Sequence, residues 1–233
     1  MNIALFGYGK MGRMIEQIAE KRNHNIVAKI DVDTKTIDFS HMDVAIDFSM
    51  PDAAFGNITR CFEHGVPVIS GTTGWLENYD QAVTLCEQKK GAFIYASNYS
   101  LGVNVFFELN RYLAKMMRNL SQYEISMEEI HHTQKLDAPS GTAITLAEGI
   151  IENSSYTAWK LDSTSDREIP IVSKRIGNTP GTHTVDYASE VDSIEIKHTA
   201  HNREGFALGA VIAAEWIVGK TGVFTMKDVL NLG

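Results

Sequence analysis

A glycine-rich turn close to the start of the chain constrains the fold more than any other feature. A short apolar run at residues 3–6 leads into Gly7-Tyr8-Gly9-Lys10-Met11-Gly12, and apolar residues then recur at helical spacing to about residue 22. In such a strand–turn–helix unit the first glycine makes the tight turn, the second lets the backbone approach a pyrophosphate, and the third packs the helix on the strand. A second strand at 25–30 ends at Asp31, where a carboxylate would bind the ribose hydroxyls of a dinucleotide. These elements, in this order, predict a Rossmann-type dinucleotide-binding domain.

The choice between NADH and NADPH depends on the charges around that turn. Asp31 favours NADH, because a carboxylate would repel the 2′-phosphate of NADPH. Lys10, Arg13 and Lys35 are nearby positive charges that could accommodate the phosphate, although each is also an ordinary surface residue. Use of both cofactors is therefore a hypothesis that the sequence leaves open.

Strand-like and helix-like segments keep alternating over the first 100 residues. Strands are expected at 44–48, 66–70 and 92–95, and helices at 51–64 and from 75 to about 90. This alternation predicts a mainly parallel sheet with ligands bound beyond the carboxyl ends of its strands. Two further small or polar segments follow strands there, Gly71-Thr72-Thr73-Gly74 and Ala96-Ser97-Asn98-Tyr99. We expect both to line the cofactor site.

From residue 101 the pattern changes to an α+β arrangement. Helices are expected at 103–119, 140–152 and 205–219, strands at 121–130, 169–175, 182–189 and 193–198, and an excursion or flexible loop at 153–167. A run of strands after an alternating section predicts a second domain with a mixed sheet. The closing residues, 224–230, end the chain.

The chemistry-bearing segment lies between the 121–130 strand and the 140–152 helix. It reads Glu129-Ile130-His131-His132-Thr133-Gln134-Lys135-Leu136-Asp137-Ala138-Pro139-Ser140-Gly141-Thr142-Ala143. Neighbouring side chains on an extended segment point to opposite faces, so the two histidines cannot do the same job. The hydroxyls and free N–H groups of the helix start offer an anion site. The segment predicts proton donors beside a carboxylate pocket; a polar loop capped by Ser140, with surface histidines, is the simpler alternative.

Composition limits the remaining classes of protein. Hydrophobic residues make up 44% of the 233 residues and charged residues 21%, as in a soluble globular protein. The net charge of −8 argues against a nucleic-acid partner. The most apolar late stretch, 206–219, is too short to span a bilayer, so no membrane partner is expected. Two cysteines without a metal or disulfide spacing fit a cytoplasmic protein, and no metal site is predicted.

The segment around the two histidines closely resembles the signature of the dihydrodipicolinate reductase family. The resemblance covers essentially the whole chain and includes three more segments: Arg175-x-Gly177-x-x-x-Gly181-x-His183, His198-x-Ala200-x-Asn202-Arg203-x-x-Phe206-Ala207-x-Gly209-Ala210, and Met226-Lys227-Asp228-Val229-Leu230. The first glycine loop is one residue shorter than in many members. Asp31-Val32-Asp33 stands where many members have an acidic–basic pair.

The resemblance implies an activity and a role for each site residue. The family reduces the cyclic imine made from aspartate semialdehyde and pyruvate to tetrahydrodipicolinate, with loss of water, in the diaminopimelate and lysine pathway. His131 would be the general acid and Lys135 a second proton donor. His132 would bind the dicarboxylate substrate, and Gly141 and Thr142 would hold a ring carboxylate at the helix start. The Gly-Thr-Thr and Ala-Ser-Asn-Tyr segments would bind the nicotinamide side of NADH or NADPH.

The resemblance also implies the domain plan. Residues 1–100 and 205–233 would form the dinucleotide-binding domain, and residues 101–204 an inserted substrate-binding and oligomerisation domain that pairs into a homotetramer. Two alternatives stay open from the residues alone. One is another NAD(P)-dependent amino-acid or imine oxidoreductase of similar architecture, and the other is a nucleotide-sensing protein without catalysis.

Overall fold

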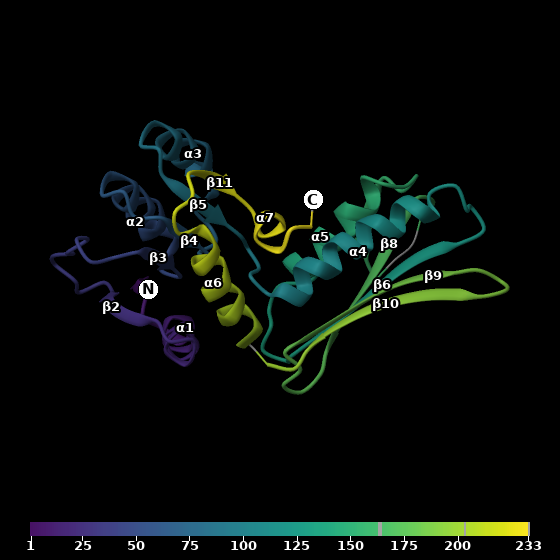
Figure 1. Cartoon of the computed structure of the whole chain (residues 1–233). Helices are drawn as coiled ribbons and strands as arrows, with labels where there is room; N and C mark the ends of the chain where they lie inside the picture. Colours follow the sequence, from purple (N-terminus) through teal and green to yellow (C-terminus); the bar gives the residue numbers. More distant parts are fainter. Residues whose placement is uncertain (163–164, 203, 233) are drawn as a thin grey trace. The chain divides into compact units, whose positions relative to one another are not determined.

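The computed structural model describes residues 1–162, 165–202 and 204–232, and it consists of two compact units (Figure 1). The first unit comprises Met1–Leu101 and Glu204–Gly233, and the second Gly102–Arg203. Arg203, which belongs to one of the family-like segments, lies outside the described residues. The chain thus leaves its first unit once and returns to it once.

The first unit is built on a six-stranded sheet in which every pairing is parallel. Its strands are β1 (Asn2–Phe6), β2 (Asn25–Ile30), β3 (Val44–Asp47), β4 (Val68–Ser70), β5 (Ala92–Tyr95) and β11 (Gly222–Phe224). The spatial order is β11-β5-β4-β3-β1-β2, so the chain moves from β1 to one side first and then to the other. The carboxyl ends of β1 and β3 therefore meet at the topological switch point, where doubly wound sheets bind ligands. The Rossmann-type fold is confirmed.

Helices cover both faces of this sheet. They are α1 (Lys10–Lys21), α2 (Pro51–Glu63), α3 (Tyr79–Gln88), preceded by the 3₁₀ turn η1 (Leu76–Asn78), α6 (Glu204–Ile217) and α7 (Met226–Leu230). Side chains alternate across a strand, so β1 sends Ile3 and Leu5 into a core with α1 and α6. Ala4 and Phe6 enter the core formed with α2 and α3 on the other face.

The second unit is a five-stranded mixed sheet in the order β10-β9-β6-β8-β7. Its elements are α4 (Leu101–Met117), β6 (Glu124–His131), α5 (Gly141–Ile151), β7 (Ala158–Leu161), β8 (Glu168–Arg175), β9 (Gly181–Ala188) and β10 (Ser193–Ala200). β6 runs parallel to β8 and antiparallel to β9. The helices α4 and α5 lie on one face of the sheet (Figure 1), where Leu113, Leu146 and Ile150 pack against Met127 and Val185.

The structure corrects part of the expected element map. The stretch at 153–167, expected to be an excursion or flexible loop, contains the strand β7, which pairs with β8. β7 is an edge strand of only four residues, Ala-Trp-Lys-Leu. Four residues are the shortest run in which alternation can be recognised, and the residues on either side are polar. The strand expected from 121 begins at Glu124, and the tail contains β11 and α7. Among the described residues no helix combines the length and the apolar character needed to cross a bilayer.

Candidate active site and dinucleotide pocket

The turn after β1 has the backbone that a dinucleotide fingerprint needs. Gly7 has a φ of +88°, and a Cβ there would lie 2.1 Å from the carbonyl oxygen of Phe48. A Cβ on Gly12 would lie 2.3 Å from the carbonyl oxygen of Gly7, so the first turn of α1 packs directly on the loop. A Cβ on Gly9 would meet no atom within 4 Å. The second glycine therefore faces open space, where a pyrophosphate could approach the backbone.

A cavity of about 370 Å³ adjoins this turn. It lies beyond the carboxyl ends of three neighbouring strands, because Gly7 follows β1, Asp31 follows β2, and Ser49 and Met50 follow β3. Ligand pockets of small molecules occupy roughly 300–1,000 Å³, and the cavity matches the half of a dinucleotide that carries the adenosine. The residues present thus fit the cofactor that the sequence predicts.

Two charged side chains line the described part of this cavity, Asp31 and Arg60. The side chain of Arg60 is held in α2 through a 2.9 Å hydrogen bond to Asn57 and a 3.2 Å bond to the carbonyl of Gly56. Lys10, Arg13 and Lys35, the expected phosphate-tolerant charges, are exposed and do not line it. Sequence reasoning missed Arg60, because nothing near it in the chain marks it as a neighbour of the glycine turn.

The Gly71–Gly74 loop is organised by a buried carboxylate, Asp47, at the end of β3. Asp47 accepts hydrogen bonds from the side chains of Ser49, Asn57, Ser70 and Thr72 at 2.6–3.2 Å. Burial raises the pKa of Asp47, and these four hydrogen bonds oppose that rise. The hydroxyl of Thr72 is thereby committed to the fold, whereas Thr73 is exposed.

The third polar segment, Ala96 to Tyr99, is mixed in character. Tyr99 is fully buried, and its hydroxyl donates to the carbonyls of Ser70 and Ile94. Its side chain therefore belongs to the core, and only its backbone is left to meet a cofactor. Ser97 is exposed, and Ala96 and Asn98 are half-buried.

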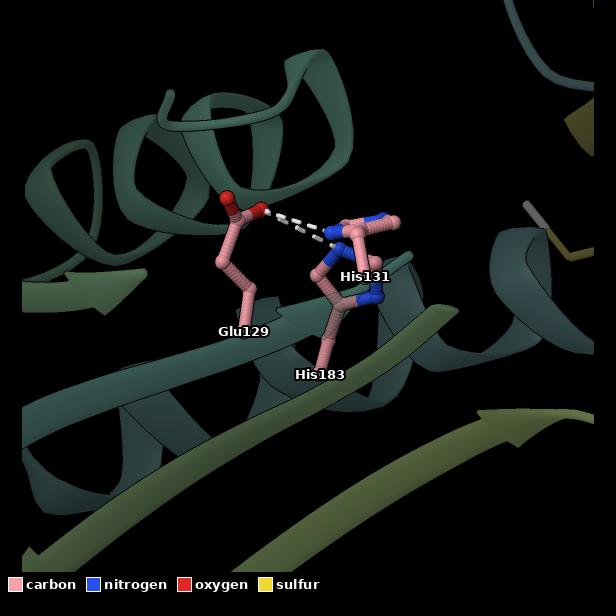
Figure 2. Close-up of side chains that lie close together, drawn as sticks. All are labelled: Glu129, His131 and His183. Carbon is pink, nitrogen blue, oxygen red and sulfur yellow. Dashed lines mark ion pairs between the residues drawn. The ribbon is translucent and has the colours of Figure 1, made fainter. Parts of the chain in front are cut away.

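The second unit places Glu129, His131 and His183 together on the helix-covered face of its sheet (Figure 2). Glu129 and His131 are two residues apart on β6 and so share a face, and His183 on β9 is the cross-strand partner of Glu129. Figure 2 shows one carboxylate oxygen aimed at both rings. Glu129 Oε2 lies 3.6 Å from His131 Nδ1 and 3.7 Å from His183 Nε2. The two rings meet edge to face at 5.0 Å.

Glu129 has further partners from two other segments, β8 and the start of α5. Ser173 Oγ donates to its Oε1 at 2.9 Å, Arg175 Nη1 and Nη2 lie 3.3 Å from the same atom, and the Ser140 N–H donates to Oε2 at 3.0 Å. Burial alone would raise the pKa of this carboxyl, but the nearby His183 ring and hydrogen bonds from Ser140 and Ser173 outweigh burial and hold the pKa well below its usual range. Glu129 is therefore a buried anion.

The three donor atoms lie within 4.8 Å of one another, the spacing of a metal site. The surroundings argue for a different role. The guanidinium of Arg175 already neutralises the carboxylate, and a divalent cation would have to share that space with it. We assign these side chains to a group of ion pairs centred on the Glu129 carboxylate.

His131 is buried, and burial lowers its pKa to about 4. The charge of Glu129 favours the imidazolium, while His183, Lys135 and Arg175 disfavour it. Nδ1 faces the carboxylate, and Nε2 lies on the side of Gly181, where a Cβ would come within 3.2 Å of it. The glycine thus leaves room for the ring.

The remaining predicted residues surround this group. His132 is half-buried just past the end of β6, and the Lys135 N–H closes a turn on its carbonyl at 3.1 Å. Lys135 Nζ lies 2.7 Å from both oxygens of Asp137. Ser140 caps α5 by accepting from the Ala143 N–H at 3.2 Å. The first N–H groups of a helix have no intrahelical acceptor, and Gly141 and Thr142 are the first two residues of α5.

Three partners of this group were quoted in the sequence patterns but given no role: Glu129, Arg175 and His183. The alternation of a strand could have placed Glu129 beside His131. The positions of Arg175 and His183 required the register of β8 and β9 on β6, which a single sequence does not give.

A second cavity, of about 820 Å³, lies at the opposite end of β6, around Glu124 and Ile125. None of the predicted site residues lines it. The chemistry-bearing residues of the second unit are therefore concentrated at the carboxyl end of β6.

A parallel dinucleotide-binding sheet in one unit, and an imidazole–carboxylate group beside a helix start in the other, define a two-unit nicotinamide-dependent oxidoreductase. Residues 1–99 match the family model described as dihydrodipicolinate reductase, N-terminus, and residues 102–230 match the one described as dihydrodipicolinate reductase, C-terminus. The chain belongs to the dihydrodipicolinate reductase family.

Individual relatives agree with the family match. Over 99% of its length the chain is 61% identical to 98% of the 4-hydroxy-tetrahydrodipicolinate reductase of Christiangramia forsetii. It is 36% identical, over the whole of both chains, to the reductase of the same name from Alkaliphilus metalliredigens. The solved structure of a dipicolinate-bound dihydrodipicolinate reductase from Paenisporosarcina sp. TG-14 matches with a TM-score of 0.79 and 22% identity, covering 97% of each chain. This last likeness shows the fold.

Proposed function

We propose that this chain reduces 4-hydroxy-tetrahydrodipicolinate, which gives dihydrodipicolinate on loss of water, to tetrahydrodipicolinate with NADH or NADPH in the diaminopimelate and lysine pathway. The observation that carries the proposal is the family match of both halves of the chain, together with a 61% identical relative that bears the name of this activity. The site contributes the chemical parts, a buried imidazole held by a carboxylate and a helix start for a dicarboxylate.

The first unit would hold the cofactor. The turn at Gly7–Gly12 would receive the pyrophosphate, and Asp31 the ribose hydroxyls. Residues Gly71, Thr72 and Thr73 and the segment Ala96 to Tyr99 would face the nicotinamide half. When bound, the reduced nicotinamide supplies a hydride to a carbon of the substrate ring.

The second unit would supply the proton. His131 is the general acid in this proposal: Glu129 faces Nδ1 and so fixes the orientation of the ring, leaving Nε2 to donate. Lys135 supplies a second proton donor and a positive charge. His132 and the helix start at Gly141 and Thr142 would bind the carboxylates, because free N–H groups and the helix dipole favour anions.

The neutral state of His131 in the free protein gives the substrate a second role. A dicarboxylate bound beside the ring brings negative charge, which favours the imidazolium and raises the pKa. Binding of the substrate would thus favour protonation of His131, which later donates that proton to the substrate.

The domain roles and the assembly are part of the same proposal. The unit Met1–Leu101 with Glu204–Gly233 would be the dinucleotide-binding domain, and Gly102–Arg203 the substrate-binding and oligomerisation domain. We propose a homotetramer in the cytoplasm, on the strength of the family resemblance. Light scattering on the purified protein should give four times the 25.8 kDa chain mass; a monomer would contradict the assembly.

The function is tested by assaying oxidation of NADH and of NADPH with freshly made dihydrodipicolinate. Simple keto acids and amino acids, each offered with the matching cofactor, serve as competing substrates. We expect turnover with dihydrodipicolinate and none above background with the others. Turnover only with an amino or keto acid would replace the proposal by another amino-acid or imine oxidoreductase, and cofactor binding without turnover of any substrate would favour a nucleotide sensor.

A further inference from the structure

One fully buried carboxylate, Glu129, joins four segments of the second unit. It is part of β6 and lies near His183 of β9, it accepts from Ser173 and Arg175 of β8, and it accepts from the backbone N–H of Ser140 at the start of α5. Removing a buried anion with this many donors costs stability, because each donor that loses it stays buried without a partner. The positions of these segments are therefore linked through one side chain.

The two carboxylate oxygens of Glu129 contact different groups. Oε2 faces His131 Nδ1 at 3.6 Å and binds the Ser140 N–H at 3.0 Å, so the same atom contacts the proposed acid and the proposed carboxylate-binding helix. Oε1 binds Arg175, whose Nε donates to the Lys135 carbonyl at 3.2 Å and whose Nη2 donates to the Asp137 carbonyl at 2.6 Å. The loop that carries the second proton donor is thus tied to the same carboxylate.

We propose that Glu129 is a positioning residue for the reaction: its buried carboxylate holds the His131 ring, the Lys135 loop and the start of α5 in one arrangement. This inference rests on the proposed function, since it assigns a role within that site. Glu129 does not touch the substrate in this scheme and acts through the three groups that do.

The charges around His131 give the proposal a specific consequence. The groups that face the ring are Glu129 on its own strand, Arg175 on β8, His183 on β9, and Lys135 in the loop. Of these, Glu129 is the one that favours a protonated ring. Replacing it by a neutral residue removes that support and leaves three groups that oppose protonation. The proton-donating form should then be confined to lower pH.

The experiment compares Glu129→Gln with Glu128→Gln in the full-length protein. Glu128 is the adjacent residue on β6, points to the opposite face, and pairs with Lys174, so its substitution matches the change in charge without reaching the site. Losing hydrogen bonds from a charged partner lowers rates by about 10- to 100-fold. We expect Glu129→Gln to lower kcat by that factor, to leave KM for the cofactor unchanged, and to move the pH profile of kcat to lower pH. Glu128→Gln should match the wild type.

A purely structural role would have a different signature. It would lower the melting temperature and the yield, but leave the kcat and pH profile of the folded fraction in place. If Glu129→Gln fails to fold, Glu129→Asp decides, because it keeps the charge but withdraws it from His131 by one methylene. A several-fold loss of kcat with a shifted pH profile in that variant supports the proposal, and wild-type values of both overturn it. In a folded Glu129→Gln protein, wild-type kcat and pH profile overturn it equally.

The test separates this inference from the function on which it rests. Absence of turnover in the wild-type protein would reject the proposed function. The His131 imidazole can then still be titrated by NMR in the wild type and in Glu129→Gln. A lower pKa in the variant supports the positioning role, and an equal pKa rejects it.

Discussion

At the scale of single residues, the burial of His131 decides its protonation state. Burial lowers its pKa to about 4, so the free protein holds this imidazole neutral near pH 7. A general acid must be protonated when it acts, and the nearby group that favours protonation is Glu129. A bound dianion would add to that effect. The proton and the substrate are therefore expected to bind together.

Proton uptake on binding of the proposed dicarboxylate substrate, with the cofactor left out, follows from this coupling. Negative charge close to His131 raises its pKa, so the complex should take up a fraction of a proton near pH 6. Calorimetry in buffers of different ionisation enthalpy measures the uptake. His131→Gln should reduce it, and binding without uptake in the wild type would contradict the coupling.

The cofactor choice is also decided by single residues, Asp31 and Arg60, which line the same cavity. In Asp31→Ala we expect KM for NADH to rise about 10-fold, because hydrogen bonds to the ribose are lost. We expect KM for NADPH to fall, because Asp31 no longer repels the 2′-phosphate while Arg60 remains. Asp33→Ala, an exposed neighbour outside the cavity lining, is the matched control. Unchanged ratios of kcat/KM in Asp31→Ala would rule out this role.

At the scale of elements, much of the fold follows from periodicity. β1, α1 and β2 were predictable because apolar spacing, glycines and an acidic strand end all agree there, and Ser140 was predictable as the start of α5. β7 was not, because a strand of four residues is too short for its pattern to stand out from the polar residues around it. The group around Glu129 depends on which residues of β8 and β9 lie opposite β6, and register between strands far apart in sequence is a tertiary property.

Asp47 shows how one strand end fixes a neighbouring loop. In the wild type, the Asn57 amide and the Ser70 and Thr72 hydroxyls donate to the Asp47 carboxylate. In Asp47→Asn the new NH2 group would face some of these donors, and hydrogen bonds would be lost. We expect unfolding in urea to show a loss of about 1–3 kcal/mol, together with a higher KM for cofactor as the loop from Gly71 loosens. Asp33→Asn, in an exposed loop, should change neither quantity. An equal effect of the two substitutions would contradict the role of Asp47.

At the scale of the whole molecule, the chain combines a dinucleotide sheet with a second unit whose stability is linked to protons. His131 has a folded-state pKa of about 4 against an ordinary 6.5, and the pKa of Glu129 is lowered as well. In both cases the unfolded chain binds protons more readily than the folded one. The free energy of unfolding must therefore fall as the pH falls.

The pH window of this loss follows from the two shifts. His131 contributes between pH 6.5 and about 4, where its full effect amounts to ~3 kcal/mol. Glu129 adds to the loss below its ordinary pKa of 4.5. Urea unfolding at pH 7.5, 6 and 5 should show decreasing stability, and His131→Gln should flatten that decrease. His201→Gln, at an exposed site, is the control. If the stability of His201→Gln depended as little on pH as that of His131→Gln, His131 would not be the source of the effect.

The most direct measurement is kcat for dihydrodipicolinate reduction in the wild type and in His131→Gln, at saturating cofactor. A positioned proton donor contributes roughly 10²- to 10⁴-fold to rate. We expect kcat to fall by a factor in that range while KM for NADH stays within error. Equal kcat in the two proteins would show that the proton comes from another group and that the buried imidazole beside Glu129 is not the acid of this reaction.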